Sequence, residues 1–176
     1  MSDDTKFDAA ALQALGAKLT ELLKIRTLPI AMKRFRTVAE MEAVQGVRRP
    51  KAGRFHTTCQ LVTQARIAGF TLGITGANVR PHSNCGGVVG LDQPSEDMLD
   101  GTRMAGVWFE TKEAACAHQT QMARAPYGEY EALVVSPLRS ARLDDPDVVL
   151  FYGTPGQTIL FVNGLQWKRY KRYDMT

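Results

Sequence analysis

Apolar side chains recur at helical spacing in some parts of the chain and alternate with their neighbours in others. The longest helical pattern covers residues 8–25, whose apolar face gathers the leucines Leu12, Leu15, Leu19, Leu22 and Leu23. This stripe predicts an amphipathic helix packed against a core, and Asp8 is placed to cap its first turn. The pattern changes at Pro29, and residues 29–35 predict a short strand.

Helices and strands then follow one another along the rest of the chain. The spacing of Thr37 and Glu40 is that of a capping box and predicts a short helix near 38–44. The other helices are predicted over 58–68, shortly after residue 84, over 111–124 and over 155–165. The strands are predicted over 70–74, 102–109, 130–136 and 148–152. Because the two kinds of element are interleaved, we expect an α/β or α+β fold: a single mixed-sheet domain with flanking helices.

The length of 176 residues fits one domain. We expect residues 1–176 to form it, with an N-terminal helix over 8–25, a cysteine-containing segment over 56–91 and a C-terminal αβ segment over 102–176. No apolar run reaches the length of about 18 residues that a membrane span requires, which predicts no membrane partner. The acidic N-terminus lacks the features of a secretory signal, and this predicts a cytoplasmic location.

The net charge of +4 is unevenly distributed. Residues 24–66 carry 10 basic and 2 acidic side chains, whereas residues 67–166 carry 6 basic and 11 acidic ones, which favours pairing between the two segments within one chain or between subunits. Residues 46–53 are predicted to form an exposed basic loop. Residues 167–173 interleave aromatic and basic side chains, as binders of single-stranded nucleic acid do. We favour a docked edge or a connecting strand there, with nucleic acid as the less favoured partner.

Each of the three histidines lies close to one of the three cysteines. The pairs are His56 with Cys59, His82 with Cys85, and His118 with Cys116. Thiolate and imidazole together suit zinc, copper or iron in clusters, and a spacing of three residues brings two side chains within reach of one ligand. A neighbouring histidine also favours the nucleophilic thiolate. We therefore predict a metal or iron–sulfur centre whose ligands are Cys59, Cys85, His56 and His82.

Each cysteine also has a purely structural interpretation. Cys116 and His118 lie among alanines on a predicted helix, and packing is the favoured interpretation for both. For Cys59, packing and function are evenly balanced. Cys85 stands between Asn84 and two glycines in a loop, so we predict that it acts as a catalytic thiolate as well as a metal ligand. An odd number of cysteines in a chain of this size favours free thiols over a disulfide framework.

The glycine-rich loop over 76–87 is a second candidate binding feature. Gly86 and Gly87 allow a ligand to approach the backbone closely, and Arg80 can hold an anion through two hydrogen bonds. We therefore predict that these three residues bind a cofactor. An ordinary turn explains the loop about equally well, and the sequence lacks the patterns of dinucleotide-binding and P-loop sites.

A set of short motifs extends over most of the chain. It comprises a leucine-rich helix before Leu28-Pro29-Ile30-Ala31-Met32-Lys33, a helix from Cys59 to Gly69, Cys85-Gly86-Gly87 running to Gly90-Leu91, Pro137-Leu138, Pro146-Asp147-Val148-Val149, and Pro155 with Gln157. In this order and spacing the motifs resemble the uncharacterised family known as domain of unknown function 169. The resemblance implies no particular activity, since none is assigned to that family. It also implies that this chain lacks a C-terminal portion beyond Thr176, which could carry a further cysteine.

Three functions are open at this point. The first is a protein that binds a metal or iron–sulfur centre and supports a redox or small-molecule transformation. The second is a thiolate-dependent enzyme that acts on a small acidic or aromatic substrate. The third is a non-catalytic binding or assembly module. As partners we expect a small molecule, together with either a second copy of the chain in a homo-oligomer or the C-terminal portion.

Overall fold

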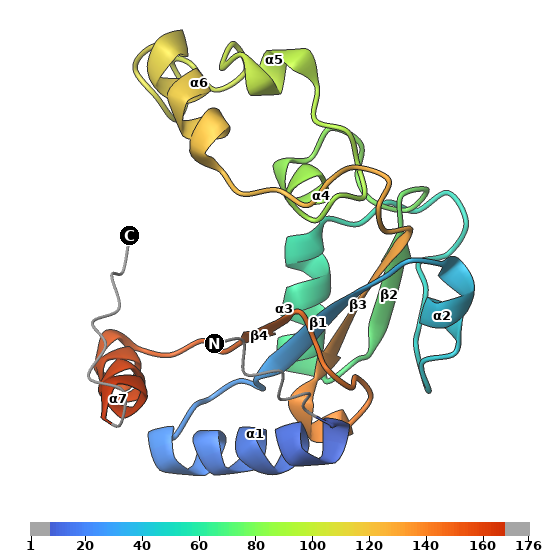
Figure 1. Cartoon of the computed structure of the whole chain (residues 1–176), viewed down its shortest axis with the longest axis vertical. Helices are drawn as coiled ribbons and strands as arrows, with labels where there is room; N and C mark the ends of the chain where they lie inside the picture. Colours follow the sequence, from blue (N-terminus) through green and yellow to red (C-terminus); the bar gives the residue numbers. More distant parts are fainter. Residues whose placement is uncertain (1–7, 168–176) are drawn as a thin grey trace, which may run out of the picture.

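The computed structural model describes residues 8–167, so the predicted aromatic and basic segment 167–173 lies outside the described residues except for Trp167. Its elements, labelled in Figure 1, follow in the order α1 (Ala9–Leu23), β1 (Ile30–Phe35), α2 (Val38–Glu42), α3 (Thr58–Ala68), β2 (Leu72–Thr75), α4 (Asn84–Val88), α5 (Glu96–Leu99), α6 (Lys112–Gln121), β3 (Ala132–Pro137), a 3₁₀ turn (Leu138–Ser140), β4 (Val148–Leu150) and α7 (Pro155–Gln166).

Side-chain caps begin the helices at the places that the sequence predicts. Asp8 caps α1 by accepting a hydrogen bond from the backbone of Ala11. Thr37, Thr57 and Thr154 each complete a capping box, in which the side-chain oxygen of the Glu or Gln three residues later accepts a hydrogen bond from the backbone N–H of the cap. The predicted ends of these helices are therefore confirmed to within a few residues.

The four strands form one sheet in the order β2-β3-β1-β4. All three pairings between strands are antiparallel, which makes the fold α+β. The expectation of a mixed sheet is corrected in this respect, since parallel pairing within residues 8–167 is confined to isolated bridges such as Arg48 with Leu72 and His56 with Val79. The central strands come from opposite halves of the chain, and β3 lies between β1 and β2.

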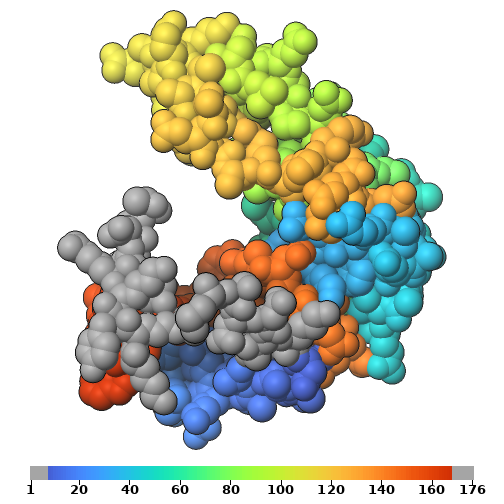
Figure 2. Space-filling model, viewed as in Figure 1, coloured from blue at the N-terminus to red at the C-terminus, as the bar shows by residue number. Residues whose placement is uncertain are grey.

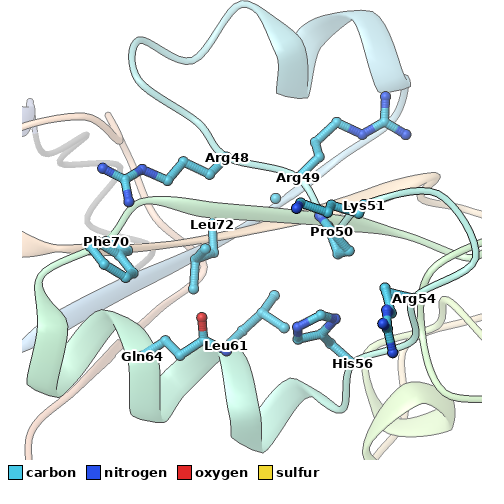
Figure 3. Close-up of a pocket in the computed structure, with 11 residues that line it drawn as sticks. Arg48, Arg49, Pro50, Lys51, Arg54, His56, Leu61, Gln64, Phe70 and Leu72 are labelled. Carbon is cyan, nitrogen blue, oxygen red and sulfur yellow. The ribbon is translucent and has the colours of Figure 1, made fainter.

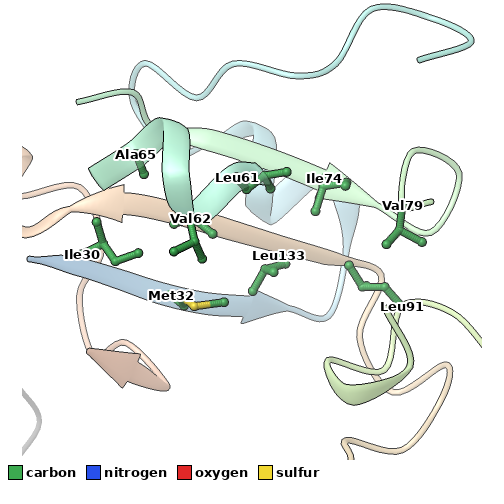
Figure 4. Packing of buried hydrophobic residues seen from close by; sticks show 10 residues of the cluster. Ile30, Met32, Leu61, Val62, Ala65, Ile74, Val79, Leu91 and Leu133 are labelled. Carbon is green, nitrogen blue, oxygen red and sulfur yellow. The ribbon is translucent and has the colours of Figure 1, made fainter. Parts of the chain in front are cut away.

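Both faces of the sheet are covered by helices, and strand periodicity decides which side chain faces which helix. Ile30, Met32, Leu133 and Val135 point towards α3 and pack with its buried apolar side chains (Figure 4). Their neighbours in sequence point to the opposite face, where they pack with residues of α1, α2 and the 3₁₀ turn. That second cluster consists of Leu12, Ala31, Met41, Ala132, Val134, Leu138 and Leu143.

Residues 96–121 form an arm that stands away from the sheet and contains α5 and α6 (Figures 1 and 2). The strand predicted over 102–109 is wrong, because this segment consists of turns with positive φ at Gly101 and Gly106. Val107 and Trp108 are 74% and 78% exposed, so these two apolar side chains face no core. The sequence pattern also missed the short α5.

The C-terminal helix α7 has no buried residue. It is held to the end of α1 by Gln157, whose Nε2 donates hydrogen bonds to the carbonyl oxygens of Leu23 and Lys24 at 2.7 and 3.1 Å. Phe161 packs against Phe151 with ring centroids 4.6 Å apart. Within residues 8–167, every helix is too short or too polar to cross a membrane.

Candidate functional site

Two of the predicted site residues, Cys59 and Cys85, meet in space although 26 positions separate them in the sequence. Their Sγ atoms lie 3.4 Å apart, within the distance of a hydrogen bond between thiols. Cys59 lies in the first turn of α3 and Cys85 in the first turn of α4, so the N-terminal ends of the two helices carry the pair. The prediction treated the two as members of one site, and the fold places them in direct contact.

A short backbone bridge just before these helices explains how the two sulfurs come together. The N–H of His56 donates to the carbonyl oxygen of Asn78, and the N–H of Arg80 donates to that of His56, both at 2.9 Å. The chain therefore enters α3 and α4 from two segments that lie side by side. Thr57 and Ser83 then cap the two helices and fix where each first turn begins.

The two thiols differ in exposure, and the surroundings of Cys85 raise its pKa. Cys59 is exposed, whereas Cys85 is partly buried. Burial, the hydrogen bond with Cys59 and the charge of a Cys59 thiolate raise the pKa of Cys85 to about 11. A raised pKa keeps Cys85 protonated near neutral pH, so Cys59 is the better placed of the two to act as an attacking thiolate. The catalytic role of Cys85 stays a prediction.

The two histidines predicted as ligands have other surroundings. His56 lines a cavity beside α3. His82 is exposed with a positive φ of 55°, and its backbone is held by Asp92, whose Oδ2 accepts its N–H at 2.6 Å, and by Arg103, which donates to its carbonyl oxygen at 3.1 Å. Among residues 8–167, no three His, Cys, Asp or Glu side chains are grouped so as to hold a metal ion.

The glycines predicted to approach a cofactor are buried against the chain's own side chains. A Cβ at Gly86 would lie 2.8 Å from Ser83 Oγ, and a Cβ at Gly87 would lie 2.8 Å from Cγ of Pro94. These contacts support a packing role, in which both glycines let α4 approach its neighbours closely. Arg80 is exposed nearby. Binding of a cofactor by these three residues stays a prediction.

Cys116 lies on α6, in the arm, and is partly buried. His118 on the same helix packs against Phe109 with ring centroids 5.0 Å apart. His118 is exposed apart from this contact, and the packing interpretation that the sequence favoured for both residues stays a prediction.

Sequence reasoning missed a basic cavity next to this site, which we define by its lining: Arg48, Arg49, Pro50, Lys51, Arg54, His56, Leu61, Gln64, Phe70, Leu72 and Gly73 (Figure 3). Its volume is about 450 Å³. The signal was present in the sequence, since four of the ten basic side chains of residues 24–66 line the cavity. We expected this segment to pair with acidic residues instead, and only Arg34 with Asp147 and Arg36 with Glu129 do so across the two segments within residues 8–167.

Comparisons with known proteins place the chain in a family without assigning an activity. No curated protein and no solved structure matches the chain. The model of one family, described as an uncharacterised ArCR, matches residues 18–176. This match covers most of the chain, including all the strands and both cysteines of the pair. The chain therefore belongs to the family of domain of unknown function 169.

Proposed function

We propose that the protein is a thiol–disulfide redox protein that works through the Cys59–Cys85 pair. The observation that carries the proposal is the contact of 3.4 Å between the two Sγ atoms. Dithiol redox sites combine an accessible thiol with a second, more shielded thiol that resolves the intermediate. The exposure of Cys59 and the raised pKa of Cys85 support this division of roles.

The proposed reaction balances with a disulfide as the oxidant. The Cys59 thiolate attacks one sulfur of a small-molecule or protein disulfide and displaces one thiol. Cys85 then loses its proton and attacks the Cys59 sulfur, which releases the second thiol and closes the intramolecular disulfide. The protein loses two electrons and two protons, and the substrate disulfide gains them. A disulfide bond measures about 2.05 Å, so the two sulfurs must approach each other further from their separation of 3.4 Å.

Incubation of the reduced protein with oxidised glutathione tests this proposal. We expect the wild type to lose two of its three free thiols and to yield a peptide linked through Cys59 and Cys85, and the matched control Cys116→Ser to behave in the same way. Cys85→Ser should hold glutathione on Cys59, because the resolving thiol is absent. Cys59→Ser should bind much less glutathione, because Cys85, the thiol of the pair that remains, is partly buried. An untouched pair in the folded wild type would disprove the proposal.

A second candidate is a soft metal ion or an iron–sulfur cluster bound by the same two sulfurs. Two thiolates on one tetrahedral ion, with metal–sulfur bonds of about 2.3 Å, lie about 3.8 Å apart, which is close to the observed 3.4 Å. The described residues offer two ligands at this place. A second copy of the chain, meeting the first at the exposed Cys59, would supply the others, and this candidate therefore includes a homo-oligomer.

Titration of the reduced, oxygen-free protein with Co²⁺ separates the two candidates. Metal binding by the pair would give thiolate-to-cobalt absorption, a larger species in size-exclusion chromatography, and loss of both in Cys59→Ser and Cys85→Ser. A colourless monomer throughout the titration would remove the metal candidate and leave the dithiol reaction standing. We retain the cytoplasmic location as part of the proposal, because a reducing compartment keeps such thiols available for exchange.

A further inference from the structure

The basic cavity is built by a loop that passes over the open edge of the sheet. β2 is an edge strand, and residues 48–56 run along it and past its end. At the start of this loop Arg48 donates its N–H to Thr71 and accepts one from Gly73, both at 2.9 Å. At the other end the backbone of His56 is paired with Asn78 and Arg80. Because both ends are fixed, the intervening segment forms the wall of a cavity whose opposite wall is α3 (Figure 3).

The polar side of the cavity is strongly basic. Arg48, Arg49, Lys51 and Arg54 line it, and its lining contains no acidic side chain. Arg49 forms an ion pair with Glu42, and the Arg48 guanidinium lies over the ring of Phe70 at 4.2 Å. Within residues 8–167, Lys51 and Arg54 belong to none of the ion pairs. Two cations are thus left without a counter-charge at one cavity.

The other side of the cavity is mostly apolar, with Gln64 of α3 as a polar member of its lining. Leu61 from α3, Leu72 from β2 and the ring of Phe70 face the space under the loop (Figure 3). One further polar atom is notable: Nδ1 of His56 is buried and has no hydrogen-bond partner among the described residues. A buried polar atom without a partner is unfavourable, so a ligand group that bonds to it would gain affinity.

We propose that the basic cavity binds a small organic anion, in which a carboxylate or phosphate group is attached to an apolar or aromatic body. The anionic group would lie between Lys51 and Arg54 and within reach of His56, and the body would lie against Leu61 and Leu72. A volume of about 450 Å³ is in the range of small-molecule sites. Because the cavity has about the volume of a small-molecule site, we favour a small molecule over a polynucleotide.

Isothermal titration calorimetry with phenyl phosphate as the probe tests the proposal. Inorganic phosphate lacks the apolar body and benzyl alcohol lacks the charge, so both should bind more weakly than phenyl phosphate. Benzoate in place of phenyl phosphate distinguishes a carboxylate from a phosphate preference. The variant Lys51→Gln/Arg54→Gln should lower the affinity for phenyl phosphate by about tenfold or more, because it removes two charge-assisted contacts. Both side chains are exposed, so the variant should fold.

A matched control removes the same charge elsewhere. Lys18→Gln/Arg26→Gln lies at exposed positions outside the cavity lining and should change the affinity less than about twofold in 0.15 M salt, where distant charges are screened. Equal affinity in the wild type and the Lys51/Arg54 variant would overturn the proposal. An oligonucleotide that binds more tightly than phenyl phosphate and displaces it would also overturn it, in favour of a polyanion-binding surface.

The proposal is independent of the thiol chemistry. Neither cysteine of the pair lines the cavity. We therefore expect Cys59→Ser/Cys85→Ser to keep the affinity of the wild type for phenyl phosphate, while it loses the glutathione reaction described above. The binding of phenyl phosphate and the reaction with glutathione therefore test the two proposals separately.

Discussion

Cys59 and Cys85 carry the same thiol group but lie in different surroundings where they meet. Cys59 is exposed, and Cys85 is partly buried and hydrogen-bonded to it. Burial is the largest cause of the raised pKa of Cys85, and the neighbouring thiol adds to it. The sequence predicted that the histidine before each cysteine would favour its thiolate, but the decisive neighbour of Cys85 is another cysteine. That neighbour is 26 residues away, so no local spacing indicates it.

The pH dependence of alkylation measures the raised pKa of Cys85. We expect the initial rate of iodoacetamide reaction at Cys85, followed by mass spectrometry of the reduced protein, to keep rising as the pH approaches about 11. In Cys59→Ala the hydrogen bond and the charge of the second thiol are gone while burial remains, so the pKa of Cys85 should fall but stay above the usual 9.0. A wild-type midpoint at or below 9.0 would contradict the assigned environment.

The same raised pKa has a consequence for stability. A thiol whose pKa is higher in the folded than in the unfolded protein holds its proton more tightly when folded. Its contribution to folding is therefore complete below about pH 9 and is lost as the pH rises through about 11. Cys85→Ala should remove this part of the alkaline destabilisation, as seen in urea unfolding at several pH values.

At the scale of elements, the arm of α5 and α6 shows where pattern reasoning is weakest. The strand predicted over 102–109 rested on apolar side chains, of which Val107 and Trp108 are in fact exposed. The turn that replaces it depends on Gly101, which packs directly against the backbone of α6. A Cβ at Gly101 would collide with the carbonyl oxygen of Lys112 and would lie 2.6 Å from the backbone nitrogen of Cys116.

Two glycine substitutions separate close packing from backbone conformation. Gly101 and Gly106 both have positive φ, of 86° and 73°, but among residues 8–167, its own chain neighbours aside, no atom lies within 4 Å of a Cβ at Gly106. Gly106→Ala should lower the free energy of unfolding by roughly 1–2 kcal/mol, the cost of a left-handed residue. Gly101→Ala should cost clearly more, because the backbone of α6 must shift. If urea denaturation gave equal losses of unfolding free energy for the two substitutions, α6 would not pack closely against Gly101.

At the scale of the whole molecule, the sheet joins segments from both halves of the chain. β3 is buried along its whole length and lies between β1 from the N-terminal half and β2. Its side chains contribute to both apolar clusters, with Leu133 facing α3 and Val134 facing α1 and α2. The basic loop and the backbone bridge at His56 are attached beside this sheet, so both candidate sites depend on its formation.

Shortening a buried side chain of β3 tests how strongly the fold depends on this strand. Leu133 is 1% exposed in the larger cluster, and Leu133→Ala should lower the free energy of unfolding by about 2–5 kcal/mol. The control Val107→Ala, at a side chain 74% exposed in the arm, should change it by less than about 0.5 kcal/mol. Both values come from urea denaturation followed by circular dichroism. A small loss of unfolding free energy for Leu133→Ala would show that the packing of β3 contributes little to the stability of the core.

The sequence by itself determined most of the helices and strands of the sheet region. These elements are predicted by local features of the sequence: the N-cap Thr57, the helix-ending Gly69 and the leucine stripe of α1. Each feature acts through hydrogen bonds or packing over a few residues, so a short stretch of sequence is enough to predict it. The sequence also identified Cys59 and Cys85 as candidate members of one site. Where apolar residues had no core to cover, as over 102–109, the same local reasoning failed.

Only the tertiary structure decided the strand order, the contact of the two sulfurs and the shape of the basic cavity. Each of these depends on contacts between residues far apart in the sequence: β1 with β3, His56 with Asn78, and Arg48 with Thr71. Such contacts form when apolar side chains from both halves of the chain are buried together, a free-energy gain that no short segment contains. For this reason the sequence indicated which residue types were chemically notable, and the fold decided which of them meet.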